Sequence, residues 1–136
     1  MPFNSNPKTV SIFGVTGSVG TSAQEVIMLN KDNFVVDTIV SNNNVKALIK
    51  AAILLNPKLV IIRNKEKFTE LEEALGKYNF ILLFGDDNIL ESSKRNVDIF
   101  VAAIIGYAGL ITTYSSVGNA KIIALANKES LVCAGP

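Results

Sequence analysis

A glycine-rich segment at positions 14–20 holds the residues whose types and spacing most clearly predict chemistry. It follows the apolar run 9–13 and opens a helical pattern, so the chain must turn sharply from a strand into a helix. Glycine permits such a turn and lets the backbone approach a ligand, and the start of the helix offers unpaired N–H groups to a phosphate. The segment therefore predicts a phosphate-binding turn, with the hydroxyls of Thr16 and Ser18 as further contacts. Close packing of the helix on the strand is the alternative explanation for the glycines.

Three consecutive asparagines, Asn42, Asn43 and Asn44, follow the second strand that the sequence predicts. Sites that prefer NAD place an acidic residue at this point, where it binds the ribose hydroxyls. Here the strand end is neutral, and Asp37 lies inside the strand, where we expect a structural role. Asn42 and Asn43 either donate amide hydrogen bonds to a 2′-phosphate or form a plain turn, because Asn tolerates left-handed backbone. In both cases Asn44 is expected to cap the next helix.

A polar cluster follows the last predicted strand, where Asn127, Lys128 and Glu129 bring together an amide, an ammonium and a carboxylate. Such clusters are commonly solvated surface, but this one is expected at the same rim as the glycine turn. The segment 106–109, after the fifth predicted strand, offers two more glycines. They allow close approach to a flat ligand or, as the alternative, close packing of a helix on a strand.

The composition excludes several classes of function. The 136 residues suit one domain, and the 13 basic and 12 acidic residues are scattered, which disfavours nucleic acid and anionic membranes as partners. Cys133 is the only cysteine and the chain has no histidine, so neither a His/Cys metal site nor a Ser-His-Asp triad can form. The polar start 1–7 is unlike a secretory signal, and the longest apolar stretch, 99–111, is too short to span a membrane. We therefore expect a cytoplasmic domain.

The apolar patterning predicts strands that alternate with helices throughout the chain. The expected strands are 9–13, 34–40, 59–62, 78–84, 97–103 and 121–125, and the expected helices are 18–29, 45–55, 65–75, 87–93 and 108–117. In the first helix the stripe Val19, Ala23, Val26 and Ile27 is expected to face the core. The predicted fold is α/β, a Rossmann-like doubly wound parallel sheet with helices on both faces. Ligands bind such sheets beyond the carboxyl ends of the strands, where the strand order reverses.

Three strings in this order, at 14–20, 102–110 and 125–132, resemble the amino-terminal domain of the 1-deoxy-D-xylulose 5-phosphate reductoisomerase family. The resemblance runs from about Lys8 to the end of the chain, and the Ala-Asn-Lys-Glu-Ser-Leu-Val string is its most specific part. Enzymes of this family isomerise and reduce 1-deoxy-D-xylulose 5-phosphate to 2-C-methyl-D-erythritol 4-phosphate. They use NADPH and a divalent metal, Mg²⁺ or Mn²⁺, in non-mevalonate isoprenoid biosynthesis. The resemblance implies the same cofactor and the same reaction for the intact enzyme.

The resemblance also implies roles for individual residues. The implied pyrophosphate contacts are Thr16, Gly17, Ser18 and Val19; the implied cofactor contacts elsewhere are Asn42, Asn43, Asn44, Asn127 and Glu129; and Lys128 is the implied substrate contact. Family members commonly have Gly-Lys-Asn where this chain has Asn42-Asn43-Asn44. Because a lysine charge is missing there, the preference for NADPH over NADH is a hypothesis.

The family's metal-binding carboxylates and most of its substrate contacts lie beyond the Asn-Lys-Glu-Ser string. Residues 1–136 are therefore expected to form the N-terminal NADPH-binding domain, without catalytic residues or metal ligands of their own and without activity alone. The intact enzyme is expected to be a homodimer. A non-catalytic Rossmann domain that senses a nucleotide is the alternative, which fold alone cannot separate from the enzyme. Dehydrogenases of the aspartate-semialdehyde type are disfavoured because they use a histidine.

Overall fold

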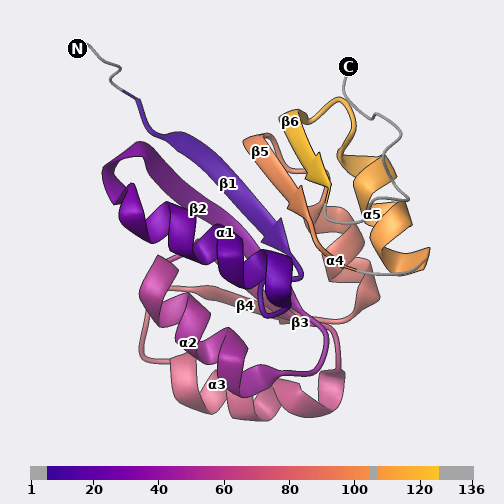
Figure 1. Ribbon diagram of the computed structural model, residues 1–136. Helices are drawn as coiled ribbons and strands as arrows, with labels where there is room; N and C mark the ends of the chain where they lie inside the picture. The colour runs from indigo at the N-terminus through magenta and orange to yellow at the C-terminus, as the bar shows by residue number, and fades with distance from the viewer. Residues whose placement is uncertain (1–5, 105–106, 126–136) are drawn as a thin grey trace.

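The computed structural model describes residues 6–104 and 107–125, which form a parallel sheet with helices on both sides (Figure 1). The strands are β1 (Lys8–Phe13), β2 (Phe34–Ser41), β3 (Leu59–Ile62), β4 (Ile81–Phe84), β5 (Val97–Ala102) and β6 (Ala120–Leu125). The helices are α1 (Ser18–Leu29), α2 (Val45–Leu55), α3 (Phe68–Leu75), α4 (Asp86–Ser92) and α5 (Tyr107–Ser116), with single 3₁₀ turns at Lys31–Asn33 and Lys65–Lys67. The strand order is β4-β3-β2-β1-β5-β6, and every pairing of neighbouring strands is parallel. The predicted doubly wound α/β fold is confirmed.

The strand order reverses beside β1, and this reversal places the helices in two layers. From β1 to β4 the chain moves in one direction, and from β4 it crosses back to β5 on the other side of β1. Because crossovers between parallel strands are right-handed, α1, α2 and α3 cover one face while α4 and α5 cover the other. The core divides accordingly: Ile12 and Ile39 pack with Leu48 of α2, whereas Phe13 and Phe100 pack with Ile89 of α4.

The central strands are buried on both faces, as their continuous apolar sequences require. All four residues of β3 are buried, and so are the last four of β1. At the other end of β1, Asp98 of β5 accepts hydrogen bonds from the backbone N–H of Thr9 at 2.8 Å and from its hydroxyl at 3.2 Å. Lys121 of β6 lies 3.2 Å from the same carboxylate. These bonds from Thr9 and Lys121 lower the pKa of Asp98, and they join three strands through one side chain.

Two expectations about the elements are wrong in detail. The strand expected at 78–84 begins only at Ile81, because the N–H of Tyr78 donates to the carbonyl of Leu75 and its ring stacks on Phe80. In α1, Val19 and Val26 are 41% and 54% exposed and do not face the core, whereas Ile27 of the same predicted stripe is buried. Within the described parts of the chain, no helix has the length and apolar character that crossing a membrane requires.

Candidate functional site

The glycine turn joins β1 to α1, and two of its glycines are required by packing. Gly14 has a φ of +97°, and a Cβ there would stand 2.6 Å from the carbonyl group of Ala103, after β5. A Cβ on Gly20 would stand 2.1 Å from the carbonyl oxygen of Gly14. The turn is held to β2, because the backbone N–H groups of Gly14 and Val15 both donate to the carbonyl of Val40 at 2.9 Å. Packing therefore explains the first and third glycines.

Gly17 differs from the other two glycines, since nothing in the fold fills the space beside it. Its φ of −82° suits any residue, and the nearest atom to an added Cβ would be the carbonyl oxygen of Gly14, 3.8 Å away. Gly17 is exposed and stands at the wall of a crevice. A glycine at this point keeps the backbone open to a ligand, which is the role of the middle glycine in dinucleotide-binding turns.

The start of α1 is free to bind an anion. Gly17 is its N-cap, no side chain caps the helix, and its first turn holds no acidic residue. The first N–H groups of a helix have no partner within the helix, and they carry a partial positive charge. Ser18 and Val19, the first two residues of the helix, are exposed at this end. Beside them, the hydroxyl of Thr16 lies 2.8 Å from the hydroxyl of Ser41, which fixes the position of Thr16.

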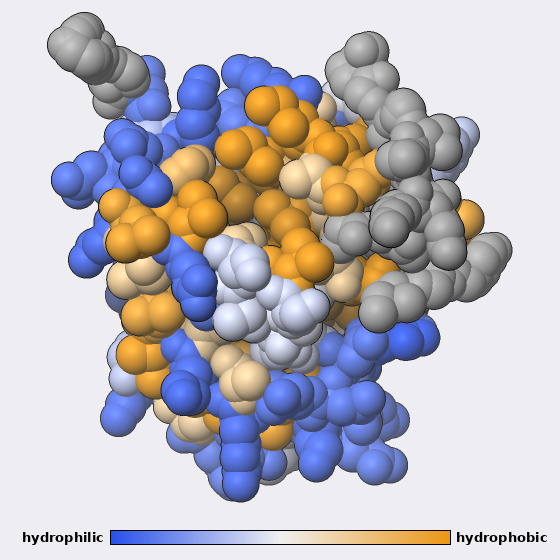
Figure 2. All heavy atoms as spheres, in the orientation of Figure 1, coloured by the Kyte–Doolittle hydropathy of each residue, from blue (hydrophilic) through white to orange (hydrophobic). Residues whose placement is uncertain are grey.

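A crevice of about 330 Å³ brings most of the predicted cofactor residues together. It lies at the carboxyl ends of β1, β2 and β5, where the strand order reverses. Its lining comprises Gly14, Thr16, Gly17, Ser41, Asn42, Asn43, Asn44, Ala103 and Ile104. In Figure 2 the surface over the end of β1 and the start of α1 has near-neutral hydropathy, as short hydroxyl and glycine residues give it. Such a surface excludes neither a phosphate nor a sugar.

The asparagines after β2 are exposed and have different roles. Asn44 caps α2, since its Oδ1 accepts from the N–H of Ala47 at 3.1 Å, which confirms the predicted cap. Asn43 Oδ1 accepts from Asn64 Nδ2 at 3.0 Å. Asn42 stands between the crevice and a second cavity, and lines both of them.

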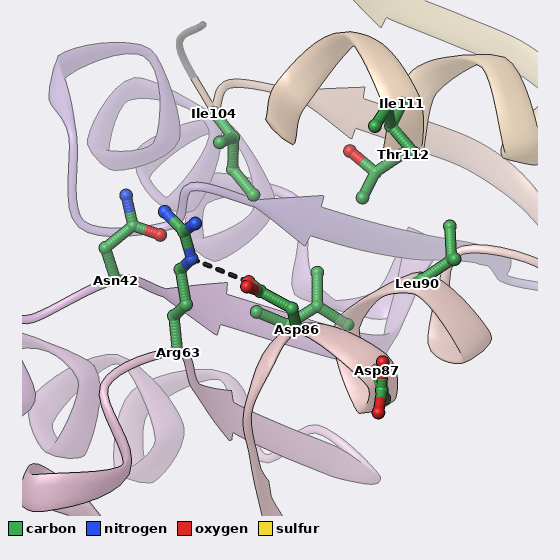
Figure 3. A pocket seen from close by; sticks show the side chains of 9 residues that line it. Asn42, Arg63, Asp86, Asp87, Leu90, Ile104, Ile111 and Thr112 are labelled. Carbon is green, nitrogen blue, oxygen red and sulfur yellow. Dashed lines mark hydrogen bonds and ion pairs between the residues drawn. The ribbon is translucent and has the colours of Figure 1, made fainter. Parts of the chain in front are cut away.

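The second cavity, of about 270 Å³, adjoins the crevice and is mainly apolar. It shares Asn42 and Ile104 with the crevice, and its other lining residues are Arg63, Asp86, Asp87, Ile89, Leu90, Ile111 and Thr112. Figure 3 shows this cavity between the ends of β3 and β4, helix α4 and helix α5. Arg63 Nε donates to Asp86 Oδ1 at 2.6 Å. Our sequence reasoning missed this cavity, although Arg63 and Asp86 follow predicted strands and could have been considered for that reason.

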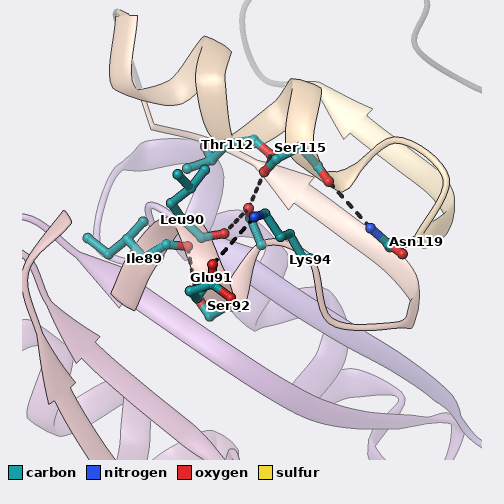
Figure 4. Close-up of polar contacts among 9 residues, drawn as sticks. Ile89, Leu90, Glu91, Ser92, Lys94, Thr112, Ser115 and Asn119 are labelled. Atoms are coloured by element: carbon teal, nitrogen blue, oxygen red, sulfur yellow. Dashed lines mark hydrogen bonds and ion pairs between the residues drawn. The ribbon is translucent and has the colours of Figure 1, made fainter. Parts of the chain in front are cut away.

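A hydrogen bond joins the end of α4 to α5, the two helices that border the second cavity. The hydroxyl of Ser93, directly after α4, is hydrogen-bonded to the hydroxyl of Ser115 on α5 and also donates to the carbonyl of Leu90 at 2.6 Å. Figure 4 labels both partners, Leu90 and Ser115. At the start of α5, a Cβ on Gly109 would stand 1.8 Å from the carbonyl oxygen of Ile104. Gly109 therefore serves close packing, the second of the two explanations for its segment. Gly106 lies outside the described residues.

Asp37, the only acidic residue of β2, is bound to Arg95 and not to the crevice. Arg95 Nε and Nη2 donate to its two carboxylate oxygens at 2.7 and 3.0 Å, and Thr38 Oγ1 donates at 2.9 Å. Burial by itself would raise the pKa of Asp37, but these hydrogen bonds and the positive charges of Arg95 and Lys58 outweigh burial and lower it. The structure thus supports the structural role expected for Asp37.

Three predicted site residues cannot be placed. Asn127, Lys128 and Glu129 lie outside the described residues, which end at Leu125, the last residue of β6. In the described ranges, 6–104 and 107–125, no three His, Cys, Asp or Glu side chains gather as they would around a metal ion.

A parallel sheet whose order reverses beside a glycine turn and an uncapped helix defines an α/β domain of the Rossmann type. The model of one family, 1-deoxy-D-xylulose 5-phosphate reductoisomerase, matches residues 10–135. The chain belongs to this family, and the resemblance found in its sequence is confirmed.

Curated relatives carry the same family name. The reductoisomerase of Porphyromonas gingivalis is 40% identical over 129 residues, which is 94% of this chain and 34% of that protein. The enzyme of Zymomonas mobilis is 40% identical over 131 residues, 96% of this chain and 34% of that protein. The chain thus spans about one third of the length of the curated relatives it matches.

Solved structures agree with this assignment. The Zymomonas mobilis enzyme in complex with NADPH has a TM-score of 0.85 and 37% identity, over 93% of this chain and 34% of that one. A DOX-P reductoisomerase in complex with NADPH, fosmidomycin and magnesium has a TM-score of 0.81 and 32% identity, over 92% of this chain and 31% of that one. The likeness covers nearly all of this chain and one part of each neighbour.

Proposed function

We propose that this chain is the NADPH-binding domain of a 1-deoxy-D-xylulose 5-phosphate reductoisomerase. The observation that carries the proposal is the crevice at the strand reversal, where the open side of Gly17 and the uncapped start of α1 lie near a strand end without a carboxylate. The neighbouring structure of the Zymomonas mobilis enzyme, which is described as a complex with NADPH, supports the choice of cofactor. The family match favours an enzyme domain over a nucleotide sensor.

Different parts of the cofactor bind in the crevice and in the second cavity. Thr16, Gly17, Ser18 and Val19 hold the pyrophosphate through hydroxyl groups and the N–H groups at the start of α1. The asparagines 42–44 face the adenosine ribose, and the apolar second cavity beside them has the lining that an adenine ring needs. When bound, NADPH supplies the hydride for the reduction. The described residues bind and orient it and take no part in proton transfer.

Residues and segments beyond the crevice supply the rest of the site. Asn127 and Glu129 complete the cofactor site, and Lys128 contacts the sugar-phosphate substrate. The divalent metal and the other substrate contacts belong to further domains of the intact enzyme, which acts as a homodimer in the cytoplasm. The neighbouring structures described with magnesium and fosmidomycin support a metal and a further ligand in such an enzyme.

Calorimetric titration of this chain with NADPH and NADH, at a stated salt concentration, tests the proposal. We expect tighter binding of NADPH, and loss of that binding in Gly17→Val, because the new side chain enters the space beside the turn. Leu29→Ala is the matched control, since Leu29 is 84% exposed at the opposite end of α1 and its change should leave both affinities unaltered. Equal or tighter binding of NADH by the folded wild-type chain would contradict the proposal.

A further inference from the structure

We propose that the turn after β3, formed by Arg63 and Asn64, gives this site its preference for a 2′-phosphorylated adenosine. Arg63 supplies the positive charge, and Asn64 is a positioning residue that orients the carboxamide of Asn43. The inference rests on the proposed function and names the residues that distinguish NADPH from NADH in this chain.

Backbone hydrogen bonds bring the β3 turn to the end of β2. The N–H of Arg63 donates to the carbonyl of Ser41 at 2.8 Å, and the N–H of Asn64 donates to the carbonyl of Asn42 at 3.0 Å. The N–H of Val45 donates to the carbonyl of Asn43 at 2.8 Å and closes the asparagine turn. The two turns therefore form one platform at the rim of the crevice.

The hydrogen bonds of this platform determine which side-chain atoms donate and which accept. The backbone N–H of Glu66 donates to Asn64 Oδ1 at 3.0 Å, and since an N–H can only donate, the oxygen of Asn64 is identified. Asn64 must then present its NH₂ group to Asn43, whose Oδ1 accepts at 3.0 Å. This leaves the NH₂ group of Asn43, which lines the crevice, to donate to a ligand oxygen.

Arg63 adds a charge beside these neutral donors. Its Nε is held by Asp86 at 2.6 Å, and Figure 3 shows its two terminal nitrogens beside the Asn42 side chain and directed away from Asp86. Arg63 lines the second cavity alone, whereas Asn42 lines both spaces, so the terminal nitrogens of Arg63 lie on the second-cavity side of the junction, beside Asn42. A guanidinium fork matches the geometry of a phosphate.

We expect the guanidinium of Arg63 to distinguish the two cofactors, because Asp86 is hydrogen-bonded to its Nε and the terminal nitrogens are directed away from that carboxylate. The end of β2 carries no carboxylate that would bind a free 2′-hydroxyl and repel a phosphate, since residues 41–44 are all uncharged. Neutral amides can donate hydrogen bonds to a phosphate, but they lack the positive charge and the bidentate fork of a guanidinium. We therefore assign most of the discrimination to Arg63, and the orientation of the neutral donors to Asn64.

Two small probes isolate the 2′-phosphate. Adenosine 2′,5′-bisphosphate and adenosine 5′-monophosphate are titrated into the 136-residue chain and followed by backbone NMR shifts, with folding of each variant checked by circular dichroism. We expect the wild type to prefer the bisphosphate, and Arg63→Ala to weaken that probe about tenfold, as for a lost charged hydrogen bond, with the monophosphate changed less than about twofold. Lys65→Ala, which removes an exposed charge two positions away, should alter neither affinity.

A double-mutant cycle tests the positioning role of Asn64. If Asn64 acts through Asn43, then Asn64→Ala and Asn43→Ala each weaken the bisphosphate, and the double variant binds no more weakly than Asn43→Ala alone. Additive losses would overturn the positioning role. Loss of both probes in Arg63→Ala, or an equal effect of Lys65→Ala, would overturn the role of Arg63.

The failure of this inference can be separated from failure of the proposed function. A wild-type chain that prefers the bisphosphate, with Arg63→Ala unchanged, rejects the inference and leaves the proposed function intact. A folded wild-type chain that binds neither probe and no NADPH rejects both.

Discussion

Hydrogen bonds within the fold decide which polar side chains remain available to a ligand. The carboxylate of Asp37 is bound by other side chains of the fold and has a structural role. It is buried, whereas its partner Arg95 lies 58 positions away in the chain and keeps 41% of its side chain exposed. The pair therefore joins the middle of β2 to the segment that enters β5. An acidic residue on the second strand of such a fold is normally considered for the ribose, and here its oxygens are already occupied.

We expect Arg95→Met to destabilise the chain by about 2 kcal/mol at neutral pH, less than the loss at a fully buried pair because Arg95 is partly exposed. The pKa of Asp37 is lowered by folding, so its contribution is complete above the ordinary aspartate pKa of about 4 and is lost as the pH falls through the lowered value. The difference between wild type and variant should therefore shrink below about pH 4. Urea unfolding at several pH values measures it, and a difference independent of pH would contradict the argument.

At the scale of elements, different glycines at the junction of β1 and α1 have different roles: Gly20 allows close packing, and Gly17 leaves the backbone open to a ligand. We predict that Gly20→Ala lowers stability by about 2 kcal/mol or more, because its Cβ would stand 2.1 Å from the carbonyl oxygen of Gly14. Gly17→Ala in the same turn should cost less than about 1 kcal/mol, since a helix N-cap tolerates the change with a modest loss. Urea unfolding of both variants makes the comparison, and equal losses would show that packing alone explains the turn.

The elements were largely predictable from the sequence, whereas the contacts between them were not. The apolar runs predict the six strands, and Asn44 could be identified as a cap because helix caps are local. The bond between Asn43 and Asn64 joins residues 21 positions apart, and only the register of β2 against β3 brings them together. Val26 was placed wrongly in the core because an apolar stripe wider than the contact with the sheet leaves its edge exposed.

At the scale of the whole molecule, the chain spans about one third of its relatives' length. We therefore expect this chain to bind the cofactor but not to convert a substrate. Incubation of the purified chain with NADPH, Mg²⁺ and 1-deoxy-D-xylulose 5-phosphate should leave the NADPH absorbance unchanged. The same assay with an intact reductoisomerase is the positive control. Metal-dependent oxidation of NADPH by this chain alone would overturn the assignment of catalysis to further domains.

The position of β1 between β2 and β5 also has a consequence for the order of folding. β1 and β2 are neighbours along the chain, but the bond between Thr9 and Asp98 joins residues 89 positions apart. Closing so large a loop costs more chain entropy than a local pairing, and non-local pairings form slowly. Ala103 and Ile104 directly follow β5 and line the crevice. We therefore expect these two residues to take their places after the glycine turn has formed. We also expect a chain emerging from the ribosome to complete the nucleotide crevice only after residues 103 and 104 have been made, and we expect its first half to fold without the nucleotide as a template.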